Sequence, residues 1–205
     1  MNQMFLILLV TFLLVFLDVR ELLSQIETIY PISPASEQTL SSICKEVNFS
    51  KGKNVQEIGH TCKTIYFVKK GAIRIYYFKE AIDITESFEF ENTFVARAES
   101  LFTGKPSRKA IQAIEDTTLI AIDSNKLFKL FDTHPDLERL FRKIIETSYV
   151  NTVNRIESLQ FNTAKERYKA LLIAAPDVLK RIPLKYVASY LGITQVSLSR
   201  IRGIK

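Results

Sequence analysis

The 205-residue chain contains few of the residues from which metal centres are built. It has two cysteines, Cys44 and Cys62, two histidines, His60 and His134, and no tryptophan. Two thiols without CxxC spacing cannot hold a four-thiolate iron–sulfur cluster, and two histidines cannot make a metal site without further ligands. We therefore expect a reduced, cytoplasmic protein with two incidental thiols and no metal cofactor.

Signatures of the common catalytic sites are also lacking. The chain has only six glycines, and they form no phosphate-cradling loop. The sequence shows no nucleophile–base pair and no carboxylate pair with supporting context. We therefore do not expect an enzyme.

One long apolar run occurs, from Met4 to Leu17. It is shorter than the roughly 20 residues that a membrane-spanning helix needs. It also lacks the preceding cations and the small-x-small cleavage site of a signal peptide. Three interpretations stay open: a helix packed on the protein or its partner, a membrane anchor, and an artefact of an upstream start codon.

Short β-type segments fill the chain between Lys45 and Asp123. Alternating polar and apolar residues, rich in Tyr, Ile, Phe and Val, are separated by turn residues such as Gly59 and Gly71, as is typical of antiparallel strands. Roughly eight strands in about 80 residues predict a small roll or barrel. A cupin enzyme would share this architecture, but it needs several inward-facing ligands that two histidines cannot supply.

Helical spacing replaces this pattern after residue 125. A short helix over 125–131 is followed by a long one that begins near Pro135 and carries an apolar stripe to Leu159. Because the stripe is longer than one small sheet can cover, a dimer seam is one interpretation, and burial between two domains is the other. Shorter helices are expected over 19–28, 36–44 and 165–173.

The stretch from Pro183 to Arg202 has the pattern of two short helices joined by a tight turn. Apolar residues at helical spacing end at Gly192, which leaves a helix at low steric cost, and Thr194 is a good N-cap for the second helix. This predicts a helix-turn-helix. The outward face of its second helix carries side chains suited to base edges and phosphates: Gln195, Ser197, Ser199, Arg200 and Arg202.

Positive charge is concentrated in the same part of the chain. Residues 163–205 hold five lysines and four arginines against one glutamate and one aspartate, a net charge of +7, whereas the rest of the chain carries −1. A duplex-binding segment needs such an excess because it must neutralise phosphates. The expected phosphate contacts are Lys165, Lys169, Lys180, Arg181, Lys185 and Arg202.

The order of β-roll, long helix and helix-turn-helix resembles the Crp/Fnr family of bacterial transcription regulators. The most specific segments are TIYFVKKGAIRIYY at 64–77 and KYVASYLGITQVSLSRIR at 185–202. The motif ESLFTGKPS at 99–107 is similar to the Bacteroidetes branch of that family.

The resemblance covers nearly all of residues 18–205 and implies an α+β fold. Its parts would be an antiparallel β-roll (a double-stranded β-helix of the cyclic-nucleotide-binding type), a long dimerisation helix and a winged helix-turn-helix. Any wing is expected near residues 180–183. The implied boundaries are an apolar extension over 1–17, the sensor over 18–132, the linker helix over 133–161 and the DNA-binding domain over 162–205.

Carried over from the family, the base-reading positions fall on Gln195, Val196 and Arg200, with Thr194 and Ser197 near the DNA backbone. Arg200 matches the family's base-contacting arginine directly. Val196 stands where members often have Glu, so it could touch a thymine methyl but could not accept a hydrogen bond from cytosine. The DNA sequence read is therefore expected to differ from that of the best-known members.

The effector pocket matches the family less well. Members that bind cyclic nucleotides use a Gly-Glu pair on the ribose and an Arg-Ser/Thr pair on the phosphate. Here Ala98 precedes Glu99, and Ser107 and Arg108 stand in reversed order, which turns a side chain to the other face of an extended segment. The candidate pocket residues are Glu99, Ser100, Ser107 and Arg108. The alternative is that they are ordinary surface residues, and we do not expect cyclic AMP to be the effector.

The sequence thus predicts a homodimeric DNA-binding transcription regulator. Its expected partners are double-stranded DNA, a second copy of the chain, RNA polymerase and a small-molecule effector of unassigned chemistry. Two alternatives stay open. One is a ligand-binding sensor that acts through protein contacts without binding DNA, and the other is a membrane-tethered regulator held by residues 4–17.

Overall fold

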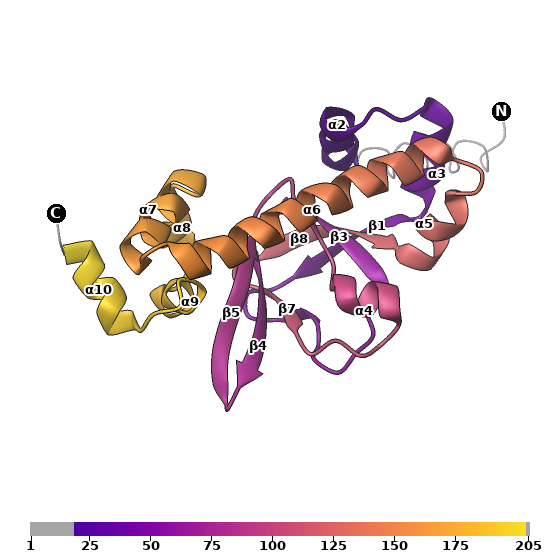
Figure 1. The fold of residues 1–205 in the computed structure, drawn as a ribbon. Helices are drawn as coiled ribbons and strands as arrows, with labels where there is room; N and C mark the ends of the chain where they lie inside the picture. Colours follow the sequence, from indigo (N-terminus) through magenta and orange to yellow (C-terminus); the bar gives the residue numbers. More distant parts are fainter. Residues whose placement is uncertain (1–18, 204–205) are drawn as a thin grey trace.

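The computed structural model describes residues 19–203 (Figure 1), so the extension predicted over residues 1–17 lies outside the described residues. The strands are β1 Cys44–Phe49, β2 Asn54–Gln56, β3 Thr64–Lys70, β4 Ile73–Lys79, β5 Ile82–Glu89, β6 Phe94–Val95, β7 Ala110–Ala113 and β8 Thr117–Asp123. The helices before the long one are α2 Arg20–Ile29, α3 Pro34–Ser42, α4 Ala98–Thr103 and α5 Ser124–Leu130. The remaining helices are α6 Pro135–Phe161, α7 Ala164–Ala174, α8 Val178–Arg181, α9 Leu184–Tyr190 and α10 Gln195–Gly203.

The strands form two four-stranded sheets, ordered β1-β8-β3-β6 and β2-β7-β4-β5. The paired strands within both sheets run antiparallel. Alternate side chains of both sheets meet in a shared core that includes Val68, Ile73, Ile111 and Leu119, as expected when two sheets pack face to face. The predicted α+β fold with an antiparallel roll is confirmed.

Helices cover the other face of the first sheet. Ile65 and Phe67 of β3 and Ile120 of β8 pack with Leu137 and Leu140 of α6 in one buried cluster, together with residues of α2 and α3. Asp136 ties the start of α6 to α3, because its carboxylate accepts hydrogen bonds from the Ser33 N–H at 2.8 Å and the Ser36 hydroxyl at 2.7 Å. The roll and the first half of α6 therefore form one body.

Two elements depart from the sequence prediction. Strand β6 is only two residues long, too short to carry an alternating pattern, and it was not predicted. Helix α4 lies in the segment expected to form the effector pocket. It ends at Gly104, which adopts the left-handed conformation at φ +69°, a common way for a helix to stop.

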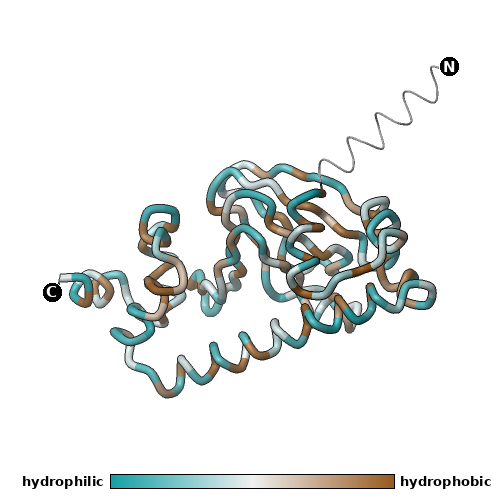
Figure 2. Tube along the Cα trace, turned by 90° about the horizontal axis from the view of Figure 1, so that it is seen from above, coloured by the Kyte–Doolittle hydropathy of each residue, from teal (hydrophilic) through white to brown (hydrophobic). Residues whose placement is uncertain are grey.

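Helix α6 runs from the roll to the carboxyl-terminal helices (Figure 1). Its first turns are buried against the sheet, whereas large apolar side chains of its second half are exposed: Tyr149 (69%), Val150 (53%), Ile156 (49%) and Leu159 (46%). Figure 2 shows hydrophobic and hydrophilic positions alternating along the same stretch. Among residues 19–203, no helix is both long and apolar enough to cross a membrane.

The carboxyl-terminal helices α7 to α10, called the helical unit below, share a core of their own, which includes Val178, Ile182 and Leu191. Two residues of the roll, Ala72 and Ile114, belong to the same cluster, so the helical unit is packed on the roll. The prediction of a wing at residues 180–183 is wrong. Lys180 and Arg181 lie in the single helical turn α8, anchored on both sides by the buried Val178 and Ile182.

Candidate nucleic-acid interface

Helices α9 and α10 are joined by the tight turn that the sequence predicts. Gly192 has φ +69°, and its N–H donates to the Ser189 carbonyl at 3.0 Å. Thr194 caps α10, because its hydroxyl oxygen accepts the Ser197 N–H at 3.1 Å and so satisfies a free donor at the helix start. The buried side chains of the pair are Val187, Ala188, Leu191 and Leu198.

The predicted base-reading residues lie together on α10. Gln195, Ser199, Arg200 and Arg202 are exposed, and Val196 is 62% exposed. Helix α10 is the element at the end of the molecule away from α2 and α3 (Figure 1). Nothing in the described structure therefore covers the predicted reading side of this helix.

The predicted backbone-contacting residues flank the same helix. Thr194 is exposed and Ser197 is half-buried, and their hydroxyl oxygens lie 3.0 Å apart. This contact fixes the first turn of α10 in place. The helix start, where free N–H groups favour an anion, is thus preformed.

Most of the predicted phosphate-binding cations are exposed. Lys165 and Lys169 stand on α7, and Lys185 on α9 lies with its Nζ 4.8 Å from the centre of the Tyr186 ring. Lys180 is also exposed, and its Nζ lies 2.7 Å from the Asp177 carboxylate. Such an exposed pair is weak and leaves the lysine able to exchange partners.

Arg181 is a correction to the predicted set of phosphate contacts. Its two Nη atoms donate to Glu91 at 2.9 and 2.7 Å, and its Nε donates to Glu115 at 3.1 Å. These hydrogen bonds hold the pKa of Arg181 above its ordinary value. A charge count along the chain cannot find such a pair, since both carboxylates come from the distant loops of the roll.

Two of the predicted pocket residues, Glu99 and Arg108, meet at the surface of the roll, whereas the two serines are bound to the backbone. Glu99 and Arg108 are exposed, with side-chain exposures of 63% and 86%, and their nearest charged atoms are 3.9 Å apart. Arg108 points into solvent, which agrees with the alternative that the reversed order implied. An ion pair this exposed contributes little stability.

The two predicted pocket serines instead bind the backbone. The Ser100 hydroxyl accepts the Cys62 N–H at 2.9 Å and donates to the Lys105 carbonyl at 2.5 Å. The Ser107 hydroxyl donates to the Lys109 carbonyl at 2.7 Å and accepts the Lys109 N–H at 3.1 Å. Both serines therefore shape the loops around α4.

The roll also holds a charged cluster that the sequence did not predict. Arg97, 8% exposed, places Nη2 3.6 Å from the Glu86 carboxylate, which also contacts the Lys109 ammonium. Within the described residues, the buried Nε of Arg97 has no hydrogen-bond partner. A sequence signal existed, because Arg97 interrupts the otherwise apolar segment FVARA.

Glu89 adds a second carboxylate to this part of the roll. In the register of β4 and β5 it stands opposite the buried Ile73. Burial raises the pKa of Glu89 to about 7, although hydrogen bonding from Ser87 and the charge of Arg97 lower it. Glu89 therefore exchanges its proton near neutral pH.

The two thiols have structural positions. Burial raises the pKa of Cys44 to about 12, and Cys62 is buried with its thiol donating to the Thr64 carbonyl at 3.4 Å. The raised pKa of Cys44 keeps that thiol from being activated as a nucleophile. Over residues 19–203, no group of three histidine, cysteine or acidic side chains could hold a metal ion.

The sequence of the roll matches a known family. Residues 46–134 match the family model of the cyclic nucleotide-binding domain. The roll is therefore similar to a domain of this type over those residues. Over 170 residues, the chain is 28% identical to the global nitrogen regulator of Synechocystis sp., with coverage of 76% of this chain and 75% of that protein.

Solved structures share the fold over most of the chain. FixK2 from Bradyrhizobium japonicum has a TM-score of 0.68 at 19% identity, covering 78% of this chain and 83% of its own. CLP from Xanthomonas campestris, a global regulator responsive to c-di-GMP, has a TM-score of 0.65 at 15% identity. The match covers 83% of this chain and 90% of CLP. A protein from Eubacterium rectale assigned to the Crp/Fnr regulators has a TM-score of 0.67 at 18% identity. The match covers 83% of this chain and 82% of that protein. At these identities the likeness shows the fold of the roll and of the helices that follow it.

Proposed function

We propose that the protein is a homodimeric, sequence-specific DNA-binding transcription regulator of the Crp/Fnr type, with the roll as its sensor. The observation that carries the proposal is the exposed side of α10, where Gln195, Arg200 and Arg202 stand on a capped helix. The fold shared with FixK2 and CLP and the similarity to a global nitrogen regulator support the same function.

Helix α10 would read DNA from the major groove. An arginine in this position can donate two hydrogen bonds to guanine, and a glutamine can pair with adenine. We assign base reading to Arg200 and Gln195 and a methyl contact with thymine to Val196. Thr194, Ser197 and Ser199, with the lysines of α7 and α9, would contact the DNA backbone.

The dimer would form along the second half of α6. Tyr149, Thr152, Ile156 and Leu159 follow the three- and four-residue spacing of a coiled-coil seam, and three of these four side chains are large, apolar and exposed. A two-fold axis along this seam would place the two α10 helices at two half-sites of a near-palindromic operator.

The sensor would act through α6 and the packing between the roll and the carboxyl-terminal helices. A small-molecule effector that binds one arrangement of these parts more tightly would shift their balance. Partners other than DNA and the second copy would be this effector and RNA polymerase, with the cytoplasm as the site of action.

Arg200→Ala tests the assignment of base reading. Because a bidentate base contact discriminates by about 1–3 kcal/mol, we expect a 5- to 150-fold loss of affinity for the operator and little change on random duplex. The operator is first selected from genomic fragments, and affinity is then measured by fluorescence anisotropy. Arg20→Ala, an exposed arginine on α2, is the control and should bind both duplexes as the wild type does.

An equal loss on operator and random duplex would assign Arg200 to the phosphates and contradict its reading role. No salt-dependent binding of any duplex by the wild type would contradict the function as a whole. The alternative of a sensor that acts through protein contacts would then be preferred.

A further inference from the structure

The carboxyl-terminal helices touch the roll at the outer edge of a sheet. Strand β5 is the last strand in its sheet, and α9 packs along it (Figure 1). The Phe88 and Tyr190 rings meet across this contact, with centroids 5.2 Å apart. A sheet edge exposes unpaired N–H and C=O groups. The contact between α9 and β5 is specific if side chains of α9 form hydrogen bonds with these groups.

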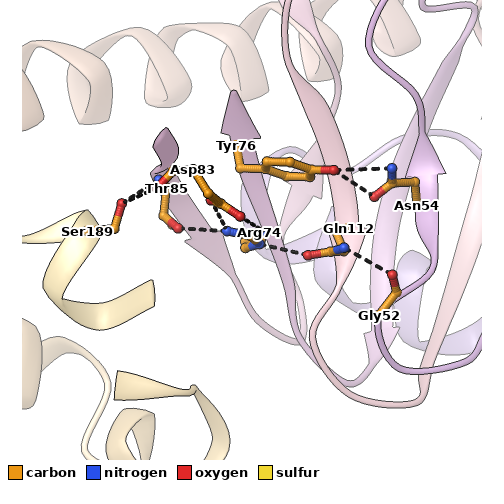
Figure 3. A network of polar contacts seen from close by, with 8 residues as sticks. All are labelled: Gly52, Asn54, Arg74, Tyr76, Asp83, Thr85, Gln112 and Ser189. Carbon is orange, nitrogen blue, oxygen red and sulfur yellow. Dashed lines mark hydrogen bonds and ion pairs between the residues drawn. The ribbon is translucent and has the colours of Figure 1, made fainter. Parts of the chain in front are cut away.

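Ser189 of α9 pairs with that edge. The Thr85 N–H donates to the Ser189 hydroxyl oxygen at 2.8 Å, and the Ser189 hydroxyl donates to the Asp83 carbonyl at 3.2 Å (Figure 3). One side chain thus supplies both the acceptor and the donor that a further strand would have supplied. These two hydrogen bonds fix the position of α9 along β5.

Arg74 completes the contact from inside the sheet. It is 1% exposed, and its two Nη atoms donate to the Asp83 carboxylate at 2.6 and 2.7 Å, while Nε donates to Gln112 at 2.9 Å (Figure 3). A buried guanidinium is tolerated only when its donors are satisfied. Here the sheet satisfies them.

The helical unit covers the guanidinium of Arg74. The central carbon of this group lies 3.6 Å from the centre of the Tyr186 ring of α9 and 4.1 Å from that of Tyr76 of β4. Such cation–π contacts are stronger when the cation is shielded from water, as the guanidinium of Arg74 is. If α9 moved away from β5, the Tyr186 contact would be lost and the edge groups of β5 would be uncovered at the same time. Both effects favour one position of α9 on the strand.

Docking leaves the reading helix uncovered. Helix α9 lies between β5 and α10 (Figure 1), and the reading residues of α10 are exposed while α9 is docked. A contact that hid α10 would keep the protein off DNA, whereas this one holds α10 outward.

We propose that Arg74, Tyr186 and Ser189 are positioning residues, whose contact with β5 sets the orientation of α10 for an operator with two half-sites. This inference rests on the proposed function. When both reading helices are held in place, the second half-site is bound at a high effective concentration, which falls if each helical unit swings freely. The contact therefore contributes to binding two half-sites and not to binding one.

The test uses full-length Ser189→Ala and Tyr186→Leu, with Ser158→Ala as the matched control. Ser158 lies on α6, and its hydroxyl oxygen accepts a 3.5 Å hydrogen bond from the Asn162 side chain one turn further along the chain. These variants spare the buried Arg74, whose removal would endanger folding.

The first measurement needs no DNA. Spin labels at Lys105→Cys on the roll and Lys169→Cys on α7 report the distribution of distances between the roll and the helical unit. Both test variants should broaden this distribution, and the control should leave it unchanged. An unbroadened distribution in both test variants would overturn the docking role whatever the DNA result.

The second measurement compares affinity for a duplex with two half-sites and for a duplex with one, using unlabelled proteins. We expect the ratio of the two affinities to fall about tenfold or more in the test variants. A broadened distribution with an unchanged ratio, or a raised affinity for two half-sites, would overturn the positioning role. If the wild type binds no duplex, both the proposed function and the positioning role fail. The spin-label distances still show whether Tyr186 and Ser189 hold α9 on β5.

Discussion

At the scale of single residues, Gly71 has a conformation and a position that only glycine can occupy. Its φ is +98°, and an added Cβ would lie 2.6 Å from the Thr117 Oγ1 and 2.8 Å from the Thr117 Cα. Its N–H also donates to the Glu91 carboxylate at 2.9 Å, the same carboxylate that binds Arg181. Gly71 therefore supports the turn that holds the helical unit.

Gly71→Ala should lower the free energy of unfolding well below that of a matched glycine variant. Gly59 has φ +85° but open space around it, so Gly59→Ala should cost only the left-handed penalty of about 1–2 kcal/mol. The clash in Gly71→Ala should add at least about 2 kcal/mol. Urea denaturation of both variants measures the difference, and equal costs would contradict the steric account.

Glu89 should make stability depend on pH. Because its pKa is raised to about 7 by burial, the folded state keeps a proton that the unfolded state releases above its ordinary value of 4.5. Linkage then requires the free energy of unfolding to fall as pH rises from about 4.5 to about 7 and to level off above that.

Glu89→Gln should remove this fall in stability, as measured by urea denaturation across the pH range. Glu99→Gln, on an exposed carboxylate, serves as the control and should retain the wild-type pH profile. A fall in stability of the same size in Glu89→Gln would show that other groups cause it.

At the same scale, the residues of α10 were predictable from the sequence because turn and cap chemistry is local. Gly192 and Thr194 take the roles that their residue types favour. Arg74, Arg97 and Arg181 were not predictable as buried or paired groups, because their partners lie far away in the sequence.

At the scale of elements, the second half of α6 is the strongest candidate for self-association. Ile156→Glu should place an unpaired charge in the proposed seam, which is costly to bury. We expect the dissociation constant of the dimer to rise at least tenfold, or about 1.4 kcal/mol. Sedimentation equilibrium measures this shift.

Asn154→Glu is the control for charge alone. It is exposed on the same helix but lies two residues away, about 200° around the helix axis. Equal dissociation by both variants, or none by Ile156→Glu, would move the dimer seam elsewhere.

The elements themselves followed largely from sequence periodicity. The strands between β1 and β8 and the start of α6 lie where alternation and Pro135 indicate. Strand β6, helix α4 and the helical turn α8 did not follow, because elements of two to six residues carry too little pattern to distinguish them from loops. The predicted wing failed for this reason.

At the scale of the whole molecule, the roll, which is the proposed sensor, and α10, the proposed reading helix, are joined in two ways. The covalent connection is α6. The second connection is the packing of the helical unit on the roll, which includes α9 on β5 and the hydrogen bonds of Arg181 of α8 to Glu91 and Glu115. A signal at the roll could reach α10 by either route, since both end at the same helical unit. Sequence order predicts the first connection, whereas the second depends on contacts between residues about 100 positions apart, such as Thr85 and Ser189.

The central claim is that α10 reads DNA, and a salt series of binding to genomic fragments around the protein's own gene tests it most directly. The series is run with and without a pool of small metabolites. We predict tight binding to one fragment, with an affinity that falls steeply as salt rises because phosphate contacts release counterions. Binding to no fragment at any salt concentration, with or without the pool, would contradict the claim.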